Sequence, residues 1–156
     1  MPDGLRARLG SDMTNVAIFT DFDGVLAPLV DDPSDARPVA GAVNALEALR
    51  DGGATVMVVS GRTIAFLAER LGDADLDLVG LYGLEQRIDG ECSTHPDAAQ
   101  WKPVIDRVAD RALRELRDTR VEEKGVSLTL HYREAPERSQ TVEAWAKSVA
   151  VESGWK

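Results

Sequence analysis

The sequence is poor in cysteine, in basic residues and in long apolar runs, and each shortage excludes a class of protein. Cys92 is the single cysteine among 156 residues, so an internal disulfide is impossible and we expect a reducing compartment. Lysine and arginine number 18 against 27 aspartates and glutamates, and the net charge of −9 argues against a nucleic-acid-binding protein. No run approaches the roughly 20 apolar residues that a membrane-spanning helix needs. The segment MPDGLRARLGSDM has no apolar signal core, so we expect a cytoplasmic protein.

What is present suits a folded chain of about one average domain. Hydrophobic residues make up 44% of the sequence and charged residues 29%, a balance typical of globular proteins rather than of disordered ones. We interpret residues 1–14 as a polar lead-in, 15–96 as a core of strands and helices, and 97–156 as a second, smaller α+β unit.

Strand and helix patterns alternate in the first half of the chain. The apolar runs 16–20 and 55–59 have the length and composition of buried strands, and 76–81 predicts a weaker third strand. Helical spacing predicts one helix over 39–50 and a second that Thr63 caps and that ends near residue 71. This strand–helix order with short links predicts the α/β class, with a parallel sheet flanked by helices.

The second half has a different pattern. An Asp-Gly pair at the centre of 86–94 predicts a hairpin turn. Beyond it we expect a long helix over roughly 98–119, a half-buried strand over 126–132 and an amphipathic helix over 138–152. The apolar positions on or near one face of the long helix are Trp101, Ile105, Val108, Leu113 and Leu116.

Polar residues follow the first two predicted strands. Asp21 and Asp23 come directly after the first strand, and Ser60, Gly61 and Arg62 come after the second. In an open parallel sheet the carboxyl ends of neighbouring strands share one edge, so we expect these residues to meet there. The set suits phosphoryl transfer, because one aspartate can attack phosphorus while the other exchanges a proton with the leaving oxygen and with water.

A phosphate site also needs positive potential, since carboxylates and phosphates repel each other. Mg²⁺ between the two aspartates supplies it, and Ser60 with the backbone amides around Gly61 would hold phosphate oxygens. Each motif alone also fits a solvated loop or a common turn, and their joint placement at successive strand ends favours the site. His95 and His131 have no partner at metal-ligand spacing, and we expect neither to bind a metal.

Several segments resemble one known family. T-D-F-D-G-V-L-A-P-L-V, starting at Thr20, and V-V-S-G-R, ending at Arg62, are similar to the first two motifs of the haloacid dehalogenase (HAD) superfamily. L-Y-G-L-E over 81–85 is similar to a segment usually written G-x-H-G-A-E, with Tyr82 in place of the histidine. V-E-E-K-G-V-S-L over 121–128, continuing to H-Y-R over 131–133, resembles the cap signature of trehalose-6-phosphate phosphatases. The resemblance covers about 15–156.

The resemblance implies a fold and an activity. It implies a HAD-like (Rossmann-like) parallel-sheet core with an α+β cap, and hydrolysis of trehalose 6-phosphate through an aspartyl-phosphate, as in trehalose biosynthesis. Asp21 would be the nucleophile and Asp23 the general acid/base, both of them Mg²⁺ ligands, and Ser60 would contact phosphate. The residues that would contact the sugar are Arg62, Glu85, Glu122 and Lys124.

Other roles stay open for these last four residues. Arg62 and Lys124 also fit plain surface charges, and Glu85 also fits a helix cap or a pair across the hairpin. We expect H-Y-R over 131–133 to be mainly structural.

The sequence departs from the family in its later part. The superfamily site also uses a lysine on a later helix and aspartates after a later strand. No aspartate follows Asp118 here, and Lys147 and Lys156 are the only lysines after the cap signature. We therefore expect an incomplete core with a partial cap, a weak Mg²⁺ site and little turnover by this chain.

Two other functions fit the same residues. One is another HAD sugar phosphatase, because the first two motifs do not select the sugar. The other is a non-catalytic domain that binds a sugar phosphate. A phospho-acceptor receiver is disfavoured, because 79–85 offers no aspartate after the third strand. In each favoured case the partner is a small-molecule sugar phosphate, without nucleic acid or membrane, and the sequence indicates no oligomeric state.

Overall fold

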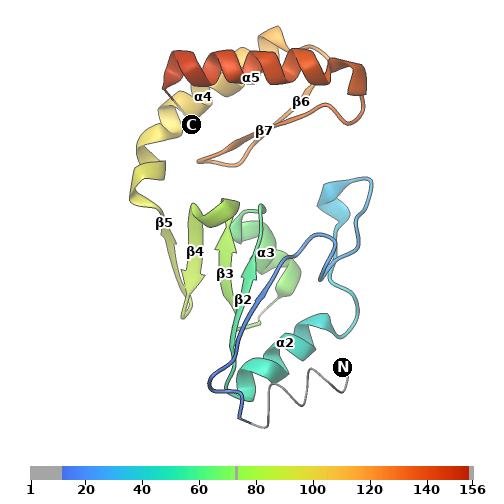
Figure 1. The fold of residues 1–156 in the computed structure, drawn as a ribbon, viewed down its shortest axis with the longest axis vertical. Helices are drawn as coiled ribbons and strands as arrows, with labels where there is room; N and C mark the ends of the chain where they lie inside the picture. The colour runs from blue at the N-terminus through green and yellow to red at the C-terminus, as the bar shows by residue number, and fades with distance from the viewer. Residues whose placement is uncertain (1–11, 73, 155–156) are drawn as a thin grey trace. The chain divides into compact units, whose positions relative to one another are not determined.

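The computed structural model of the protein describes residues 12–72 and 74–154. Most of the predicted lead-in, and Lys156, therefore lie outside the described residues. The chain divides into two compact units, Met1–Ser93 and Thr94–Lys156, and Figure 1 shows the elements of each. Among the described residues, no helix combines the length and the apolar character needed to cross a membrane.

The first unit is built on a five-stranded sheet with the order β1-β2-β3-β4-β5. Its strands are β1 (Ala17–Thr20), β2 (Thr55–Val59), β3 (Asp77–Gly80), β4 (Glu85–Ile88) and β5 (Glu91–Thr94). The first three strands are parallel, whereas β4 runs antiparallel to β3. The predicted α/β class and parallel sheet are confirmed. The sheet has more than three strands because the Asp-Gly hairpin adds β4 and β5 beside β3.

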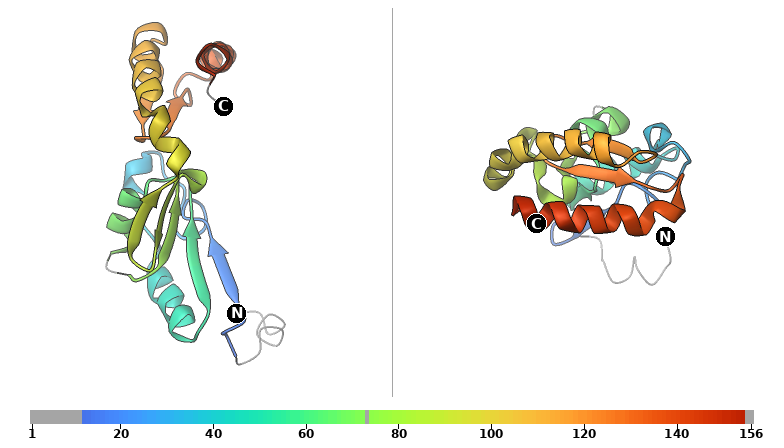
Figure 2. Two further views of the ribbon diagram at one scale, coloured as in Figure 1. Left: turned by 90° about the vertical axis from the view of Figure 1, so that its left-hand side faces the viewer. Right: turned by 90° about the horizontal axis from the view of Figure 1, so that it is seen from above.

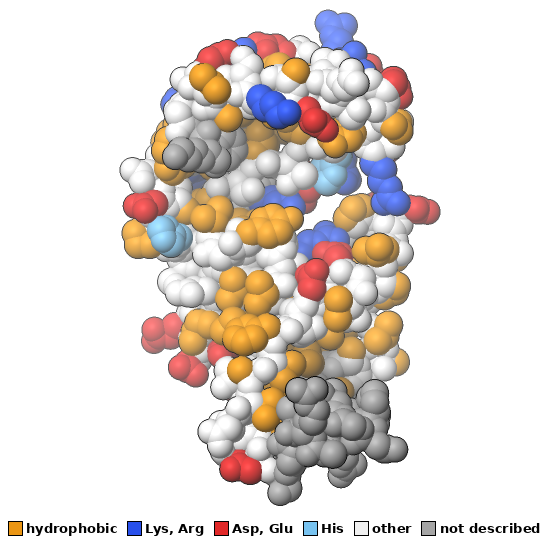
Figure 3. Space-filling model, in the orientation of Figure 1, with side chains coloured by type: hydrophobic (Ala, Val, Ile, Leu, Met, Phe, Trp, Pro, Cys, Tyr) orange, Lys and Arg blue, Asp and Glu red, His pale blue; other side chains and the backbone are white. Residues whose placement is uncertain are grey.

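Two helices, α2 (Ala42–Asp51) and α3 (Ile64–Leu71), cover one face of this sheet (Figure 2). Successive strand side chains point to opposite faces, so only alternate positions of β2 reach the helices. Val56 and Val58 are accordingly buried with Leu67 of α3 in the core, while Val59 is partly exposed on the other face. Figure 3 shows hydrophobic side chains gathered on the uncovered side of the strands.

The helix predicted from residue 39 begins three residues later, at Ala42. The reason is local: Gly41 adopts a left-handed backbone with φ of 84°, and Val39 donates its backbone N–H to the Leu26 carbonyl at 2.9 Å. These two features hold 39–41 outside the helix. The helix ends as expected, because the N–H of Gly52 caps it on the Ala48 carbonyl at 3.1 Å.

The second unit packs two helices against a hairpin. Its elements are α4 (Pro96–Glu115), β6 (Arg120–Glu123), β7 (Leu128–His131) and α5 (Ser139–Ser153). The hairpin is antiparallel, with Val121 opposite Leu130. These two side chains pack with Tyr132 and Trp145 on a small core whose buried members are Ala112, Leu116 and Val142.

Three expectations for this unit need correction. Leu113 is 60% exposed, because the buried positions Ile105, Val108, Ala112 and Leu116 recur at three- and four-residue spacing and Leu113 lies off that stripe. The predicted strand over 126–132 begins only at Leu128, since a turn with Gly125 at φ of 73° precedes it. The long helix ends at Glu115 rather than near 119, and β6 occupies a stretch for which no strand was predicted.

Candidate active site

The loop after β1 presents two carboxylates on a buried anchor. The Phe22 side chain is fully buried, and its carbonyl accepts hydrogen bonds from the N–H groups of Leu26 and Ala27 at 3.0 and 2.9 Å. This tight turn fixes the residues on either side of Phe22. Asp21 is exposed and its Oδ1 accepts the Phe22 N–H at 2.6 Å, whereas the Asp23 side chain is 31% exposed.

The loop after β2 is held at the neighbouring strand end. Ser60 is buried, with 4% of its surface exposed, and its N–H donates to the Val79 carbonyl of β3 at 2.9 Å. The Ser60 hydroxyl oxygen accepts the N–H of Arg62 at 3.3 Å. Since β1 and β2 are adjacent and parallel, this loop and the Asp21–Asp23 loop share one edge of the sheet, as the sequence predicts.

Arg62 joins the two loops directly. Its Nε donates to one oxygen of Asp23 and its Nη2 to the other, both at 2.8 Å, although the two residues are 39 positions apart in sequence. The guanidinium carbon also lies 4.4 Å from the centre of the Phe66 ring, which meets the Phe22 ring edge-on at 5.7 Å. A two-point, partly buried pair stacked on a ring is more stable than an ordinary surface ion pair. In this structure Arg62 is therefore no plain surface charge.

Glu85 is the first residue of β4, and its side chain contacts the first turn of α3. Its Oε2 accepts the backbone N–H of Ile64 at 2.9 Å, and the Thr63 hydroxyl accepts the N–H of Phe66 at 3.2 Å. Both contacts satisfy N–H groups that a helix leaves without partners in its first turn, and a negative charge is favourable at that end. Thr63 caps α3 as predicted, and Glu85 makes a capping hydrogen bond as well.

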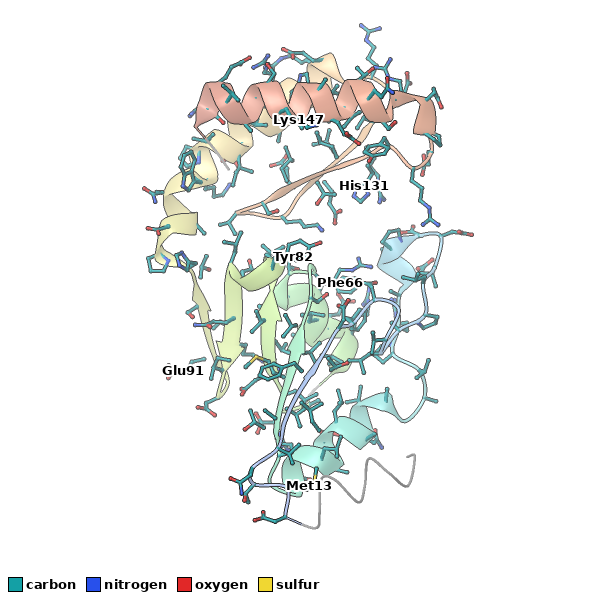
Figure 4. The ribbon with its side chains drawn as sticks, viewed as in Figure 1. Met13, Phe66, Tyr82, Glu91, His131 and Lys147 are labelled. Carbon is teal, nitrogen blue, oxygen red and sulfur yellow. The ribbon has the colours of Figure 1, made fainter. Side chains whose placement is uncertain are left out.

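Glu122 lies on β6 in the second unit, and Lys124 is the first residue after that strand. The Oε2 of Glu122 lies 2.6 Å from Nε2 of His131 and 3.7 Å from Nζ of Lys124. Burial tends to raise the pKa of Glu122, but the His131 hydrogen bond and nearby positive charges outweigh it and hold that pKa below its ordinary value. Figure 4 labels His131 on this hairpin.

A metal would have few ligands to choose from. Within the described ranges, no group of three or more histidine, cysteine or acidic side chains is arranged to hold an ion. Asp21 and Asp23 remain as a pair of carboxylates, and Mg²⁺ in proteins is commonly bound by one or two carboxylates together with water and phosphate oxygens. The pair fits that minimal set once Arg62 releases the Asp23 oxygens, both of which accept its hydrogen bonds in this structure. Cys92 is exposed in the first unit and forms no disulfide.

Sequence reasoning missed two contacts of these residues. Phe66 supports Arg62 from four positions along the chain, on the first turn of α3, a spacing that could have suggested the contact. The hairpin register sets Arg120 opposite His131. Glu122 is two residues further along β6, on the same face as Arg120, and so lies within reach of His131. That register was not predicted, since β6 was not.

Comparisons with known proteins agree with one another. The family model described as trehalose-phosphatase matches residues 19–156. A trehalose-phosphate phosphatase of Mycobacterium avium is 39% identical over 137 residues, which are 85% of this chain and 33% of that protein. A trehalose-phosphate phosphatase of Mycobacterium leprae is 34% identical over 140 residues, which are 85% of this chain and 32% of that protein. The chain thus spans about a third of the length of the curated relatives it matches.

A solved structure supports the fold. The C-terminal domain of a Candida albicans trehalose-6-phosphate phosphatase superposes with a TM-score of 0.79 at 23% identity. The match covers 99% of this chain and 56% of the Candida chain. The chain therefore shares the fold of trehalose-6-phosphate phosphatases, as the sequence resemblance implies.

Proposed function

The chain belongs to the trehalose-phosphatase family, and from this premise we propose that its first unit carries the reacting groups for hydrolysis of trehalose 6-phosphate. The products would be trehalose and phosphate, as trehalose biosynthesis requires. One observation carries the proposal: Asp21 and Asp23 follow β1, Ser60 to Arg62 follow β2, and a hydrogen-bonded pair joins the two loops. The substrate would be a small-molecule sugar phosphate in the cytoplasm.

Asp21 is the nucleophile in this proposal. Its Oδ1 is fixed by the Phe22 N–H, and we assign attack on phosphorus to Oδ2. The new bond joins Asp21 to phosphorus, and the bond from phosphorus to the sugar oxygen breaks. Asp23 gives its proton to that oxygen. Asp23 then takes a proton from water, the water attacks phosphorus, and the bond to Asp21 breaks to release phosphate.

Arg62 has to move for this cycle to run. Both oxygens of Asp23 accept hydrogen bonds from Arg62, so Asp23 takes up a proton from water and passes it to the leaving oxygen only after the pair opens. We propose that a bound sugar phosphate draws the guanidinium away from Asp23. Arg62 would then contact the sugar, as the family resemblance implies.

The remaining residues hold the substrate in this proposal. Ser60 and Gly61 would hold phosphate oxygens, while Glu85, Glu122 and Lys124 would contact sugar hydroxyls. Mg²⁺, held by Asp21 and Asp23, would neutralise charge on the phosphate and the carboxylates. Because the described residues offer only these two carboxylates to the ion, we expect weak Mg²⁺ binding and slow turnover.

The same feature favours a second candidate function. A site with two carboxylates, one of them paired with arginine, also suits a domain that binds a sugar phosphate without hydrolysing it. The two functions differ in what happens after binding. Another sugar phosphatase of the superfamily is the remaining alternative, and only the substrate distinguishes it.

Phosphate release and calorimetry with the same chain separate these functions. We expect release of phosphate from trehalose 6-phosphate with Mg²⁺, faster than from glucose 6-phosphate. Asp21→Asn should abolish it, and Asp31→Asn, at an exposed aspartate of the next turn, should not. Tight binding without release supports the binding domain. Release that Asp21→Asn leaves undiminished overturns the proposal.

A further inference from the structure

Tyr82 combines an unusual backbone with an exposed aromatic side chain. Its φ and ψ are 57° and 33°, and Leu81 before it has φ of 49°, so two successive residues other than glycine are left-handed. Such a backbone is strained, and residues with strained backbones occur more often at functional sites than elsewhere. Tyr82 is also 88% exposed, so burial of its ring does not compensate for the strain.

The loop after β2 holds this turn in place. The Leu81 N–H donates to the Arg62 carbonyl at 2.9 Å, and the Tyr82 N–H donates to the Ser60 carbonyl at 3.3 Å. Leu81 is buried, with 1% of its surface exposed, and this burial compensates for the strain of its own left-handed backbone. The fold therefore fixes Tyr82 beside the loop that carries Ser60, Gly61 and Arg62. Figure 4 shows Tyr82 at the carboxyl end of β3.

The hydroxyl end of the Tyr82 ring lies against Gly61. A Cβ atom at position 61 would come within 2.6 Å of both the Cζ atom and the hydroxyl oxygen of Tyr82. Any residue other than glycine would therefore displace the phenol. Glycine at 61 and the left-handed turn at 82 together place an O–H donor directly on this loop.

We propose that Tyr82 is a further substrate-binding residue, whose phenol donates a hydrogen bond to an oxygen of the phosphate monoester. The proposal rests on the proposed function, which assigns phosphate binding to Ser60 and Gly61. A phenol O–H donates one hydrogen bond, and a bond to a charged phosphate oxygen is among the stronger ones. Because the Tyr82 backbone is already fixed at the loop, only the side chain has to be ordered when the substrate binds.

The test measures binding of inorganic phosphate and of trehalose 6-phosphate, each with Mg²⁺, by calorimetry. Tyr82→Phe removes only the hydroxyl, and we expect it to weaken both affinities by about tenfold. The control is Tyr132→Phe, which alters the other tyrosine of the chain, in the second unit. It should leave both affinities within about twofold of the unaltered chain.

Carbon-13 labelling of the two tyrosine rings gives a readout that does not depend on an affinity change. Phosphate should shift the Tyr82 ring signals and leave those of Tyr132 in place, with assignment by Tyr132→Phe. Equal phosphate affinity in Tyr82→Phe, or unmoved Tyr82 signals while phosphate binds, overturns this inference and leaves the proposed function standing. Failure of both ligands to bind overturns both.

Discussion

Each unit holds a carboxylate in place with neighbouring basic side chains, but the two arrangements differ in kind. In the Asp23 cluster (Asp23, Arg62 and Phe66), a guanidinium binds both carboxylate oxygens and rests on a ring. In the Glu122 cluster (Glu122, Lys124 and His131), a histidine and a lysine meet a single oxygen. The planar guanidinium can donate to both oxygens of one carboxylate at once, which neither the histidine nor the lysine does here.

The difference also lies in how each cluster is assembled. The Asp23 cluster joins two loops that are 39 residues apart in sequence and depends on the parallel sheet. The Glu122 cluster forms within one hairpin, across nine residues. We infer that the Asp23 cluster is sensitive to the packing of the whole first unit, whereas the Glu122 cluster is sensitive to the hairpin register and to pH. Four variants, ordered by expected effect, test this distinction.

The largest effect is expected from Phe22→Ala. Phe22 is fully buried and anchors the Asp21–Asp23 loop, so its loss should lower the free energy of unfolding by about 3–5 kcal/mol. Urea unfolding followed by circular dichroism measures this change. Phe19→Ala is the control, because Phe19 is 64% exposed and should cost under about 1 kcal/mol. Equal losses from the two variants would contradict the anchoring role of Phe22.

Arg62→Ala should have the next largest effect. It removes the two-point pair with Asp23 and the stacking on Phe66, and we expect a loss of about 1–2 kcal/mol, since Asp23 remains partly in contact with water. Arg62→Lys should recover less than half, because an ammonium cannot bind both oxygens in that geometry. An exposed arginine of α4, Arg107, provides the matched Arg→Ala control. Full recovery by lysine would show that charge alone matters.

Glu85→Ala should cost about 1 kcal/mol, the usual value of a lost helix cap. Hydrogen exchange of the first α3 amides measures the effect where it arises, and the Ile64 amide should lose most protection. Glu91→Ala, at an exposed glutamate of β5, is the control. Unchanged protection at Ile64 would remove the capping role and leave substrate contact as the function of Glu85.

The smallest effect is a pH dependence in the second unit. The folded state lowers the pKa of Glu122 below its ordinary 4.5. The resulting stabilisation is therefore fully present above pH 4.5. It is lost as the pH falls through the lowered pKa that Glu122 has in the folded state. All three tryptophans of the chain follow residue 94, so tryptophan fluorescence reports thermal unfolding of this unit.

Between about pH 6 and pH 3 the unaltered chain should lose more thermal stability than Glu122→Gln. Glu123→Gln, at the exposed neighbour on β6, should follow the unaltered chain. Parallel curves for all three proteins would show that the Glu122 cluster does not couple stability to pH.

Much of the first unit follows from the sequence because its signals are strong and local. Apolar runs mark β1 and β2, Thr63 marks the start of α3, and the strand–helix alternation places Asp21 and Ser60 on one edge. The pairing of Arg62 with Asp23 does not follow, since a side chain at the same edge has several possible partners. Stacking of the guanidinium on the Phe66 ring, a contact between packed side chains, favours this partner.

The second unit is less readable from sequence. Strand β6 reads R-V-E-E, and one apolar residue in four gives no detectable alternation. Ala112 is buried and Leu113 exposed because the exact phase of the helix decides which of two adjacent apolar residues faces the core. The left-handed backbone of Tyr82 in the first unit is equally hidden, since tyrosine rarely adopts it.

The most direct test of the central claim is to trap the intermediate. The chain is mixed with trehalose 6-phosphate and Mg²⁺, quenched in acid and digested, and the peptides are analysed by mass spectrometry. We expect a phosphate adduct on the peptide that contains Asp21, lost in Asp21→Asn and retained in Asp31→Asn. Phosphate release without that adduct, or an adduct that persists in Asp21→Asn, would rule out Asp21 as the nucleophile.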